Sequence, residues 1–157
     1  MTIHTADLCD QHDVRIVAPM FHSYGGRPAF GGPISTLKVF EDNSLVRQAL
    51  ETFGDDRVLV IDGGGSLRCA LVGDQLAKLA ARNGWAGIVV YGCIRDARAI
   101  AHMDIGVLAL NTHPLKSVKK GAGEADIAVV FGGVAFVPGQ FLYADEDGIV
   151  VADTALI

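Results

Sequence analysis

The sequence predicts an α/β protein in which a parallel central sheet is combined with an antiparallel sheet, in one domain of residues 1–157. Three observations predict this fold. Continuous apolar runs alternate with amphipathic helical segments, as in parallel sheets with right-handed crossovers. Roughly the last forty residues instead hold short β-type runs separated by turns. The 19 glycines lie between these runs and suit tight connections between short strands.

The parallel part is expected to contain four strands and three helices. Residues 35–40 alternate polar and apolar side chains, and residues 58–61 form the apolar run VLVI, which is typical of a strand buried on both faces. Before the first helix, Asp42, Asn43 and Ser44 offer candidate N-caps. The remaining strands are expected at residues 87–91 and 107–110, and the helices at 44–53, 74–83 and 96–103.

Four short runs near the C-terminus are predicted to form an antiparallel meander. Gly-Gly, Pro-Gly-Gln and Asp-Glu-Asp-Gly turns separate them, and such turns connect neighbouring antiparallel strands. The runs lie at residues 127–131, 134–137, 141–144 and 149–152. Because no linker-like segment and no internal repeat divides the chain, one domain is expected.

The composition excludes several classes of protein. Half of the 157 residues are hydrophobic and 20% are charged, so the chain can bury a core and is not disordered. No apolar run approaches the ~18 residues of a membrane span, and the first fifteen residues do not resemble a signal peptide. We therefore expect a cytoplasmic protein with no membrane partner. The formal net charge of −5 argues against direct nucleic-acid binding, which uses basic surfaces.

The candidate site lies where two predicted strands end. The first of these strands leads through a glycine-rich turn to the start of a helix, whose unpaired amides attract a carboxylate. The glycine-rich turn is residues 63–65, and the start of the helix is formed by Gly73, Asp74, Gln75 and Leu76. The second strand ends at Arg95 and Asp96. Because ligands bind beyond the carboxyl ends of parallel strands, Asp74 and Asp96 could share a divalent cation while Arg95 holds a carboxylate.

Each of these residues also has a purely structural interpretation. From the residues alone, the structural and the functional interpretation both stay open. Asp74 is typical of a helix N-cap, and Arg95 with Asp96 is typical of a surface pair beside a cap. The glycines at residues 63–65 suggest a nucleotide or S-adenosylmethionine loop, but Arg68 stands where the third glycine belongs and no P-loop lysine follows.

The histidines, lysines and cysteines offer weaker candidates. The five histidines lack the spacing of a zinc site. Three clustered lysines could supply a Schiff-base amine but are more typical of a solvated loop: Lys116, Lys119 and Lys120. Three cysteines without a CxxC spacing are expected to be buried thiols: Cys9, Cys69 and Cys93.

Several segments, taken together, resemble one family. They are ADLCD at residues 6–10, YGG at 24–26, DGGGSL at 62–67, ALVGDQL at 70–76, GW at 84–85, RD at 95–96, DIG at 104–106 and DEDG at 145–148. The most specific element is an Asp, twenty residues and then Arg-Asp, which Asp74, Arg95 and Asp96 fit without a gap. Over essentially its whole length the chain resembles the regulator of ribonuclease activity A family. That family also contains the class II 4-hydroxy-4-methyl-2-oxoglutarate/4-carboxy-4-hydroxy-2-oxoadipate aldolases.

This resemblance implies a three-layer β/β/α fold of the swivelling-domain type, assembled as a homotrimer with sites between subunits. It implies that Asp96 ligates Mg²⁺ or Mn²⁺ and that Asp74 holds metal-bound water. By the same resemblance, the turn from Gly73 to Leu76 receives the pyruvyl carboxylate and Arg95 contacts the substrate.

The reaction that the resemblance implies is retro-aldol cleavage of a 4-hydroxy-2-oxo acid to pyruvate and a second 2-oxo acid, with oxaloacetate decarboxylation as a side activity. Both reactions pass through a pyruvate enolate, whose charge a chelated cation and Arg95 would stabilise. Many aldolase members continue past the final strand and supply an acidic residue to the neighbouring site. Here that group is either missing or comes from elsewhere, such as Asp145, Glu146 or Asp147.

Two other functions belong beside the lyase hypothesis. The resembled family includes short proteins that bind and inhibit ribonuclease E without chemistry, and this chain has a similar length. Such regulators tend to lose part of the Asp…Arg-Asp set, whereas Asp74, Arg95 and Asp96 are all present here. The third candidate is a methyltransferase that acts on a quinone precursor.

Overall fold

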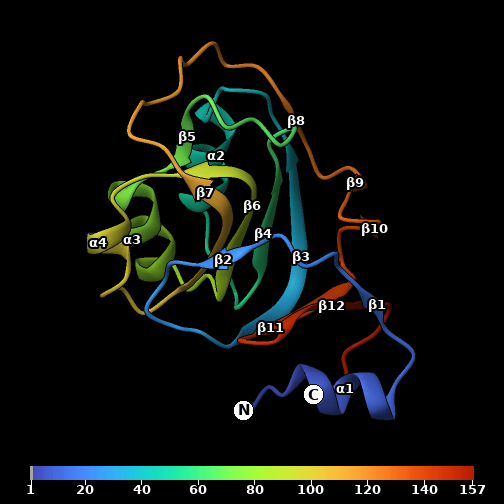
Figure 1. The fold of residues 1–157 in the computed structure, drawn as a ribbon. Helices are drawn as coiled ribbons and strands as arrows, with labels where there is room; N and C mark the ends of the chain where they lie inside the picture. Colours follow the sequence, from blue (N-terminus) through green and yellow to red (C-terminus); the bar gives the residue numbers. More distant parts are fainter. Residues whose placement is uncertain (1) are drawn as a thin grey trace.

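The computed structural model describes residues 2–157 and places a parallel sheet between a helical layer and an antiparallel layer (Figure 1). The helices are α1 (Thr5–Gln11), α2 (Ser44–Leu50), α3 (Asp74–Arg82) and α4 (Ala97–Ile100). The strands of the first two thirds of the chain are β1 (Arg15–Ile16), β2 (His22–Ser23), β3 (Phe30–Lys38), β4 (Val58–Asp62), β5 (Ala70–Val72), β6 (Gly87–Ile94) and β7 (Gly106–Thr112). The later strands are β8 (Glu124–Ala125), β9 (Val129–Phe131), β10 (Val134–Phe136), β11 (Phe141–Asp145) and β12 (Gly148–Ala152).

Strands β3, β4, β6 and β7 form the parallel sheet, in that order, as the alternation of strands and helices predicts. Helices α2, α3 and α4 each lie in one of the crossovers between successive strands. Every residue of β4 is buried, which confirms that this apolar run is a central strand. The C-terminal end of β6 extends three residues further than predicted, to Ile94, and this extension matters for the site.

The C-terminal strands do not form the single meander that was predicted. Strands β9 and β10 pair only with each other, whereas β11 and β12 form a hairpin that continues the large sheet through β3. The long strand β3 makes this possible, because its first half pairs antiparallel with β11 and its second half pairs parallel with β4. The structure therefore has one large mixed sheet, with the order β1-β12-β11-β3-β4-β6-β7-β2, and the separate antiparallel pair of β9 and β10.

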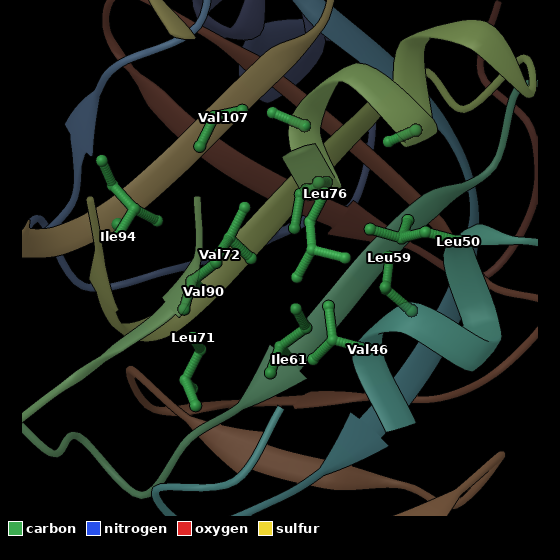
Figure 2. Close-up of a cluster of buried hydrophobic side chains, with 14 of the residues drawn as sticks. Val46, Leu50, Leu59, Ile61, Leu71, Val72, Leu76, Val90, Ile94 and Val107 are labelled. Atoms are coloured by element: carbon green, nitrogen blue, oxygen red, sulfur yellow. The ribbon is translucent and has the colours of Figure 1, made fainter. Parts of the chain in front are cut away.

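The alternation of side chains along the central strands divides the interior into two cores. In β4, Leu59 and Ile61 face the helices, whereas Val58 and Val60 face the antiparallel strands. Figure 2 shows the core between the sheet and the helices, in which Leu59 and Ile61 of β4 pack with Val46 from α2. Each fully buried Val, Leu or Ile side chain contributes about 1.5–3 kcal/mol, so both faces of the sheet stabilise its position.

Helix α1, which was not predicted, covers the outer face of the β11–β12 hairpin. Leu8 packs with Tyr143 and Val150, and the Thr5 amide and hydroxyl donate to the Asp145 carboxylate at 2.7 and 2.6 Å. Burial alone would raise the pKa of Asp145, but its hydrogen bonds from Thr5 and from the turn that follows hold the pKa below its usual value. Asp145 therefore ties α1 to the sheet within this chain.

The cysteine prediction is correct for two of the three thiols. All three cysteines are free, and Cys69 and Cys93 are buried as expected, but Cys9 is exposed on α1. Within residues 2–157 the longest helix, α3, has nine residues, and no helix is long and apolar enough to cross a bilayer.

Candidate functional site

The short strand β5, which the sequence interpretation missed, brings the two halves of the candidate site together. It pairs parallel with the extended end of β6, with Ala70 opposite Cys93 and Val72 opposite Ile94. The residues that follow each strand therefore lie side by side, and the Arg95 amide donates to the Val72 carbonyl at 2.9 Å. This pairing closes the gap of twenty residues between Asp74 and the Arg-Asp pair.

The start of α3 is capped by Asp96 and not by its own side chains. Gly73 is the N-cap residue, Asp74 is the first helical residue, and neither makes a side-chain cap. Instead, the Asp96 carboxylate accepts a hydrogen bond from the Asp74 amide at 3.0 Å. The N-cap interpretation of Asp74 is therefore wrong, whereas the first turn of α3 does bind a carboxylate, as its unpaired amides favour.

The approach of Asp96 depends on the absence of a side chain at Gly73. A Cβ atom at this position would lie 2.8 Å from Asp96 Oδ2. Asp96 itself has a left-handed backbone, with φ 60° and ψ 38°, at the start of α4. Non-glycine residues in this conformation carry strain of order 1 kcal/mol and concentrate at functional sites. The strained turn places the exposed Asp96 carboxylate beside the first turn of α3.

All of the predicted site residues line one cavity of ≈ 190 Å³. The predicted members are Gly73, Asp74, Gln75, Leu76, Arg95 and Asp96. Arg95 is half-buried, and its guanidinium donates to the Pro114 carbonyl at 3.4 Å. The structure thus brings both carboxylates and the guanidinium of the Asp…Arg-Asp set to the same hollow at the carboxyl ends of β5 and β6.

The cavity also contains residues that the sequence interpretation did not assign to it. Asn43 and Arg47 come from the start of α2, and Lys116 and Lys119 come from the segment after β7. The lysines are exposed, as expected of a loop, but they also line the cavity. A signal for Arg47 was available, because it lies off the apolar stripe of a helix that starts beyond the carboxyl end of a parallel strand.

Asn43 is held in one orientation at the wall of the cavity. Its side-chain amide donates to the Leu71 carbonyl at 3.0 Å, and its backbone amide donates to the Ser117 hydroxyl at 3.2 Å. Within residues 2–157 its Oδ1 atom is buried with no hydrogen-bond partner. A buried acceptor without a partner costs about 1–3 kcal/mol.

Asp42 fixes the lysine segment to the start of α2. Its buried carboxylate accepts hydrogen bonds from the Ser44 hydroxyl at 2.6 Å, from the Ser44 amide at 2.9 Å and from the Lys120 and Ala122 amides at 2.8 and 3.1 Å. Burial alone would raise the pKa of Asp42, but these hydrogen bonds outweigh it and hold the pKa well below its usual range. The Asp42 carboxylate is thus occupied by the Ser44 hydroxyl and by backbone amides.

Two carboxylates line the cavity, which is fewer than a metal site built entirely from protein side chains would need. Among the described residues, no three His, Cys, Asp or Glu side chains are grouped so that they could hold a metal ion by themselves. The carboxylates that line the cavity are those of Asp74 and Asp96. Such a pair resembles the usual protein contribution to a Mg²⁺ site, where water and substrate oxygens supply the other ligands.

Comparison with known proteins places this arrangement in a family. The model of the RraA-like family, described as Aldolase/RraA, matches residues 5–151. A protein from Aromatoleum aromaticum named "Putative 4-hydroxy-4-methyl-2-oxoglutarate aldolase" is 67% identical, with all of both chains covered.

Two solved structures have nearly the same fold. One is described as S-adenosylmethionine:2-dimethylmenaquinone methyltransferase from Geobacillus kaustophilus; it is 52% identical, with a TM-score of 0.96 over 98% of this chain and 97% of that one. The other is described as the RNA-processing inhibitor RraA from Thermus thermophilis; it is 46% identical, with a TM-score of 0.96 over 100% of this chain and 96% of that one. With the family model, the aldolase-named relative and this shared fold in agreement, the chain belongs to the RraA-like family.

Proposed function

We propose that the protein is a divalent-metal-dependent lyase that cleaves 4-hydroxy-4-methyl-2-oxoglutarate, or 4-carboxy-4-hydroxy-2-oxoadipate, to pyruvate and a second 2-oxo acid. Oxaloacetate decarboxylation is proposed as its side activity. The observation that carries the proposal is the single cavity in which Asp74, Arg95 and Asp96 meet at the start of α3. The names of the close relatives support an aldolase at the level of the family.

The first role in the proposal is to hold the pyruvyl carboxylate of the substrate. The amides of Gln75 and Leu76, next to the Asp74 amide that binds Asp96, lie in the first turn of a helix of nine residues, where the helix dipole favours an anion. The Asp74 amide already binds the Asp96 carboxylate, which illustrates the affinity of this turn for such a group. Arg95 adds a guanidinium that can bind a carboxylate through two parallel hydrogen bonds.

The donors of the cavity fit Mg²⁺ or Mn²⁺. Asp96, with Asp74 beside it, offers hard carboxylate oxygens, and no thiol or imidazole lines the cavity in the described residues. When bound, the cation would act as a Lewis acid that stabilises negative charge on the 2-oxo group. Asp96 would be its ligand, and the hydrogen bond between Asp96 and α3 would keep that carboxylate beside the substrate site.

The proposed chemistry needs a stabilised enolate and a base. In the aldol substrate the C3–C4 bond breaks, its electron pair enters the pyruvate enolate, and the 4-hydroxyl loses a proton as C4 becomes a ketone. Transfer of one proton to C3 of the enolate then gives pyruvate. Arg95 offers a fixed positive charge where the enolate charge develops. Asp74 offers a carboxylate that can accept the hydroxyl proton. Oxaloacetate instead loses CO₂ to give the same enolate, and no base is required for that step.

We propose a homotrimer with sites near the subunit boundary. Phe40, Leu115 and Val118 are exposed by 59%, 58% and 65%, and all three line a hollow that shares Lys116 with the candidate site. An apolar surface of this kind beside a polar cavity is typical of a protein interface. Light scattering after size exclusion should give three times the chain mass of 16.5 kDa.

The function is tested by measuring pyruvate release with a coupled dehydrogenase. The three substrates are 4-hydroxy-4-methyl-2-oxoglutarate, 4-carboxy-4-hydroxy-2-oxoadipate and oxaloacetate, each with Mg²⁺, with Mn²⁺ and with EDTA. We expect metal-dependent release that Asp96→Ala abolishes. If none of the three substrates yields pyruvate in a metal-dependent way, the lyase proposal is wrong.

The second candidate function is regulation of ribonuclease E by direct binding. It is favoured by the likeness to the solved structure described as an RNA-processing inhibitor, which spans the whole chain. It predicts capture of the ribonuclease by the immobilised protein, with equal yield for the wild type and Asp96→Ala. The methyltransferase hypothesis predicts binding of S-adenosylmethionine in calorimetry, and a flat titration would reject it.

A further inference from the structure

We propose that a hollow on the sheet face opposite α3 binds a primary amine that carries an apolar group, with the Asp62 carboxylate as the acceptor for its ammonium group. This second site is separate from the candidate site and does not depend on the proposed lyase function. The hollow has a volume of ≈ 550 Å³. We call it the amine site, and the lining residues that matter are Lys38, Phe40, Asp62, Tyr91, Glu124 and Val130.

The amine site lies at the carboxyl ends of three parallel strands. Lys38, Asp62 and Tyr91 are register partners in β3, β4 and β6, so their side chains share one face of the sheet. Alternation along β4 turns this face toward the antiparallel strands and away from the helices. Strands β8 and β9, which lie beside β3 (Figure 1), contribute Glu124 and Val130 to the hollow.

Asp62 is a buried carboxylate with one hydrogen bond. It is 8% exposed, and its Oδ1 atom accepts a hydrogen bond from the Gly64 amide at 2.9 Å. Within residues 2–157, no other hydrogen bond and no ion pair reaches this carboxylate. In the same part of the chain, Asn43 Oδ1 is the one fully buried side-chain oxygen or nitrogen without a partner, so Oδ2 of Asp62 reaches the hollow. Because buried charges are normally paired, this oxygen is available to a cationic donor.

The charged neighbours of Asp62 leave its charge uncompensated. Two carboxylates and one ammonium line the hollow, so its net charge is −1. Lys38 and Glu124 are register partners in the antiparallel pair of β3 and β8, where opposite charges compensate each other. Both side chains are exposed, so solvent screens them more than it screens Asp62. The hollow therefore favours a cation.

The glycine-rich turn after β4 holds Asp62 in place and offers no amide to an anion. The amides of Gly63 and Gly65 both donate to the Tyr91 carbonyl at 3.1 Å, and the Gly64 amide donates to Asp62. A phosphate-binding loop presents such amides to its ligand. Since all three amides are engaged within the chain, this turn serves the carboxylate at its start and not a nucleotide.

Tyr91 and two apolar side chains form the rest of the amine site. The Tyr91 ring stacks on Phe131 with the ring centres 4.7 Å apart, and a Cβ atom at Gly65 would lie 3.1 Å from the phenol oxygen. The phenol is therefore fixed before a ligand binds, which lowers the entropy lost on binding. Phe40 and Val130 are exposed by 59% and 67%, so an apolar group on the ligand would cover them.

A primary ammonium fits these acceptors better than a guanidinium or a divalent cation. Because the Gly64 amide occupies Oδ1, Asp62 is not free to form the two parallel hydrogen bonds that a guanidinium prefers. Mg²⁺ requires more oxygen ligands, and the described residues contain no group of three metal-binding side chains. An ammonium is a compact charge with three donors, which can reach Asp62 Oδ2 and the Tyr91 hydroxyl together.

Calorimetry with phenethylamine tests the amine site, and 2-phenylethanol is the matched ligand without the charge. The protein is used in its native assembly at pH 7. Wild type should bind the amine about tenfold or more tightly than the alcohol, and Asp62→Asn should lose about tenfold or more in affinity for the amine, since hydrogen bonds to charged groups have that value. Lys38→Met should bind the amine more tightly than wild type, because a like charge is removed from the hollow.

Two variants serve as controls. Asp55→Asn changes an exposed carboxylate before the other end of β4, and Asp96→Ala changes the candidate site; both should bind the amine as wild type does. Equal affinity for amine and alcohol, no binding of either, or wild-type affinity in Asp62→Asn would overturn the amine site. Loss of binding in Asp96→Ala would also overturn it, because the amine would then occupy the candidate site. If Asp62→Asn does not fold, unchanged affinity in Lys38→Met is the result that overturns it.

Discussion

Replacement of Gly73 by Ala should damage the site while leaving the fold intact. The added Cβ would lie 2.8 Å from Asp96 Oδ2, and ordinary contact begins near 3.4 Å, so the oxygen must retreat by about 0.6 Å. The hydrogen bond from the Asp74 amide would then lengthen from 3.0 Å to about 3.6 Å, which is beyond hydrogen-bonding range.

Gly73→Ala should change the stability of the protein little and its activity strongly. Loss of the hydrogen bond from the Asp74 amide to Asp96 lowers the free energy of unfolding by about 1 kcal/mol. Because φ −120° and ψ −168° suit alanine, the lower entropy of the unfolded chain raises it by about 0.4–1 kcal/mol. Tm should therefore change by no more than about 4 °C. Displacement of a reacting group by about 1 Å costs about 10²-fold in rate, so we expect kcat/KM for pyruvate release to fall about tenfold to a hundredfold.

The control for this variant is Gly92→Ala, whose new Cβ meets only the apolar atoms Leu71 Cδ1 at 3.3 Å and Val90 Cγ1 at 3.5 Å among side chains. It should retain kcat/KM close to the wild-type value. Thermal unfolding by circular dichroism and the coupled pyruvate assay measure both variants. A Gly73→Ala protein with wild-type activity, or one that fails to fold, would refute the reasoning that this glycine serves the Asp96 carboxylate.

Three further predictions concern the acidic residues and the metal. Asp96→Ala should abolish pyruvate release and lower the free energy of unfolding by about 0.5–2 kcal/mol through loss of the α3 cap; retained activity would contradict this. Asp42→Asn should destabilise the protein by about 1–3 kcal/mol at pH 7. Because the folded state lowers the pKa of Asp42, this stabilisation is full above about pH 5 and should shrink as the pH falls below about 4; denaturant titrations at pH 7, 5 and 3.5 that show a constant difference would contradict it. EDTA should stop pyruvate release and added Mg²⁺ should restore it, whereas unaltered turnover after exhaustive chelation would reject metal dependence.

The parallel core could be predicted because its sequence signals are local. Residues 58–61 and 87–91 are apolar without interruption, and the amphipathic stripe that follows each strand marks a crossover helix. The C-terminal strands were located correctly, and the pairings of β9 with β10 and of β11 with β12 agree with the predicted meander, but the second partner of β11 was not predicted. Alternation shows which face of a strand is buried, but it does not show whether β11 pairs with β10 or with the distant β3.

The members of the site could be predicted better than the contacts between them. The Asp…Arg-Asp spacing identified the correct side chains, but the strand that joins them, β5, has only three residues and gives almost no periodic signal. For the same reason the sequence assigned the cap of α3 to Asp74, although the carboxylate of Asp96, 22 residues away, binds the Asp74 amide. Asn43 was missed because only the tertiary fold brings it to the cavity, whereas for Arg47 the position off the apolar stripe of α2 was a signal that was not used.

The central claim is that the first turn of α3 and the Arg-Asp pair at the end of β6 together hold a divalent cation and a pyruvyl group. A crystal structure of the protein with Mg²⁺ and pyruvate tests this most directly. We predict Mg²⁺ on the Asp96 carboxylate and the pyruvate carboxylate on the amides of Gln75 and Leu76, within reach of Arg95. Well-ordered crystals in which both ligands bind elsewhere, or in which neither binds at saturating concentration, would contradict the account.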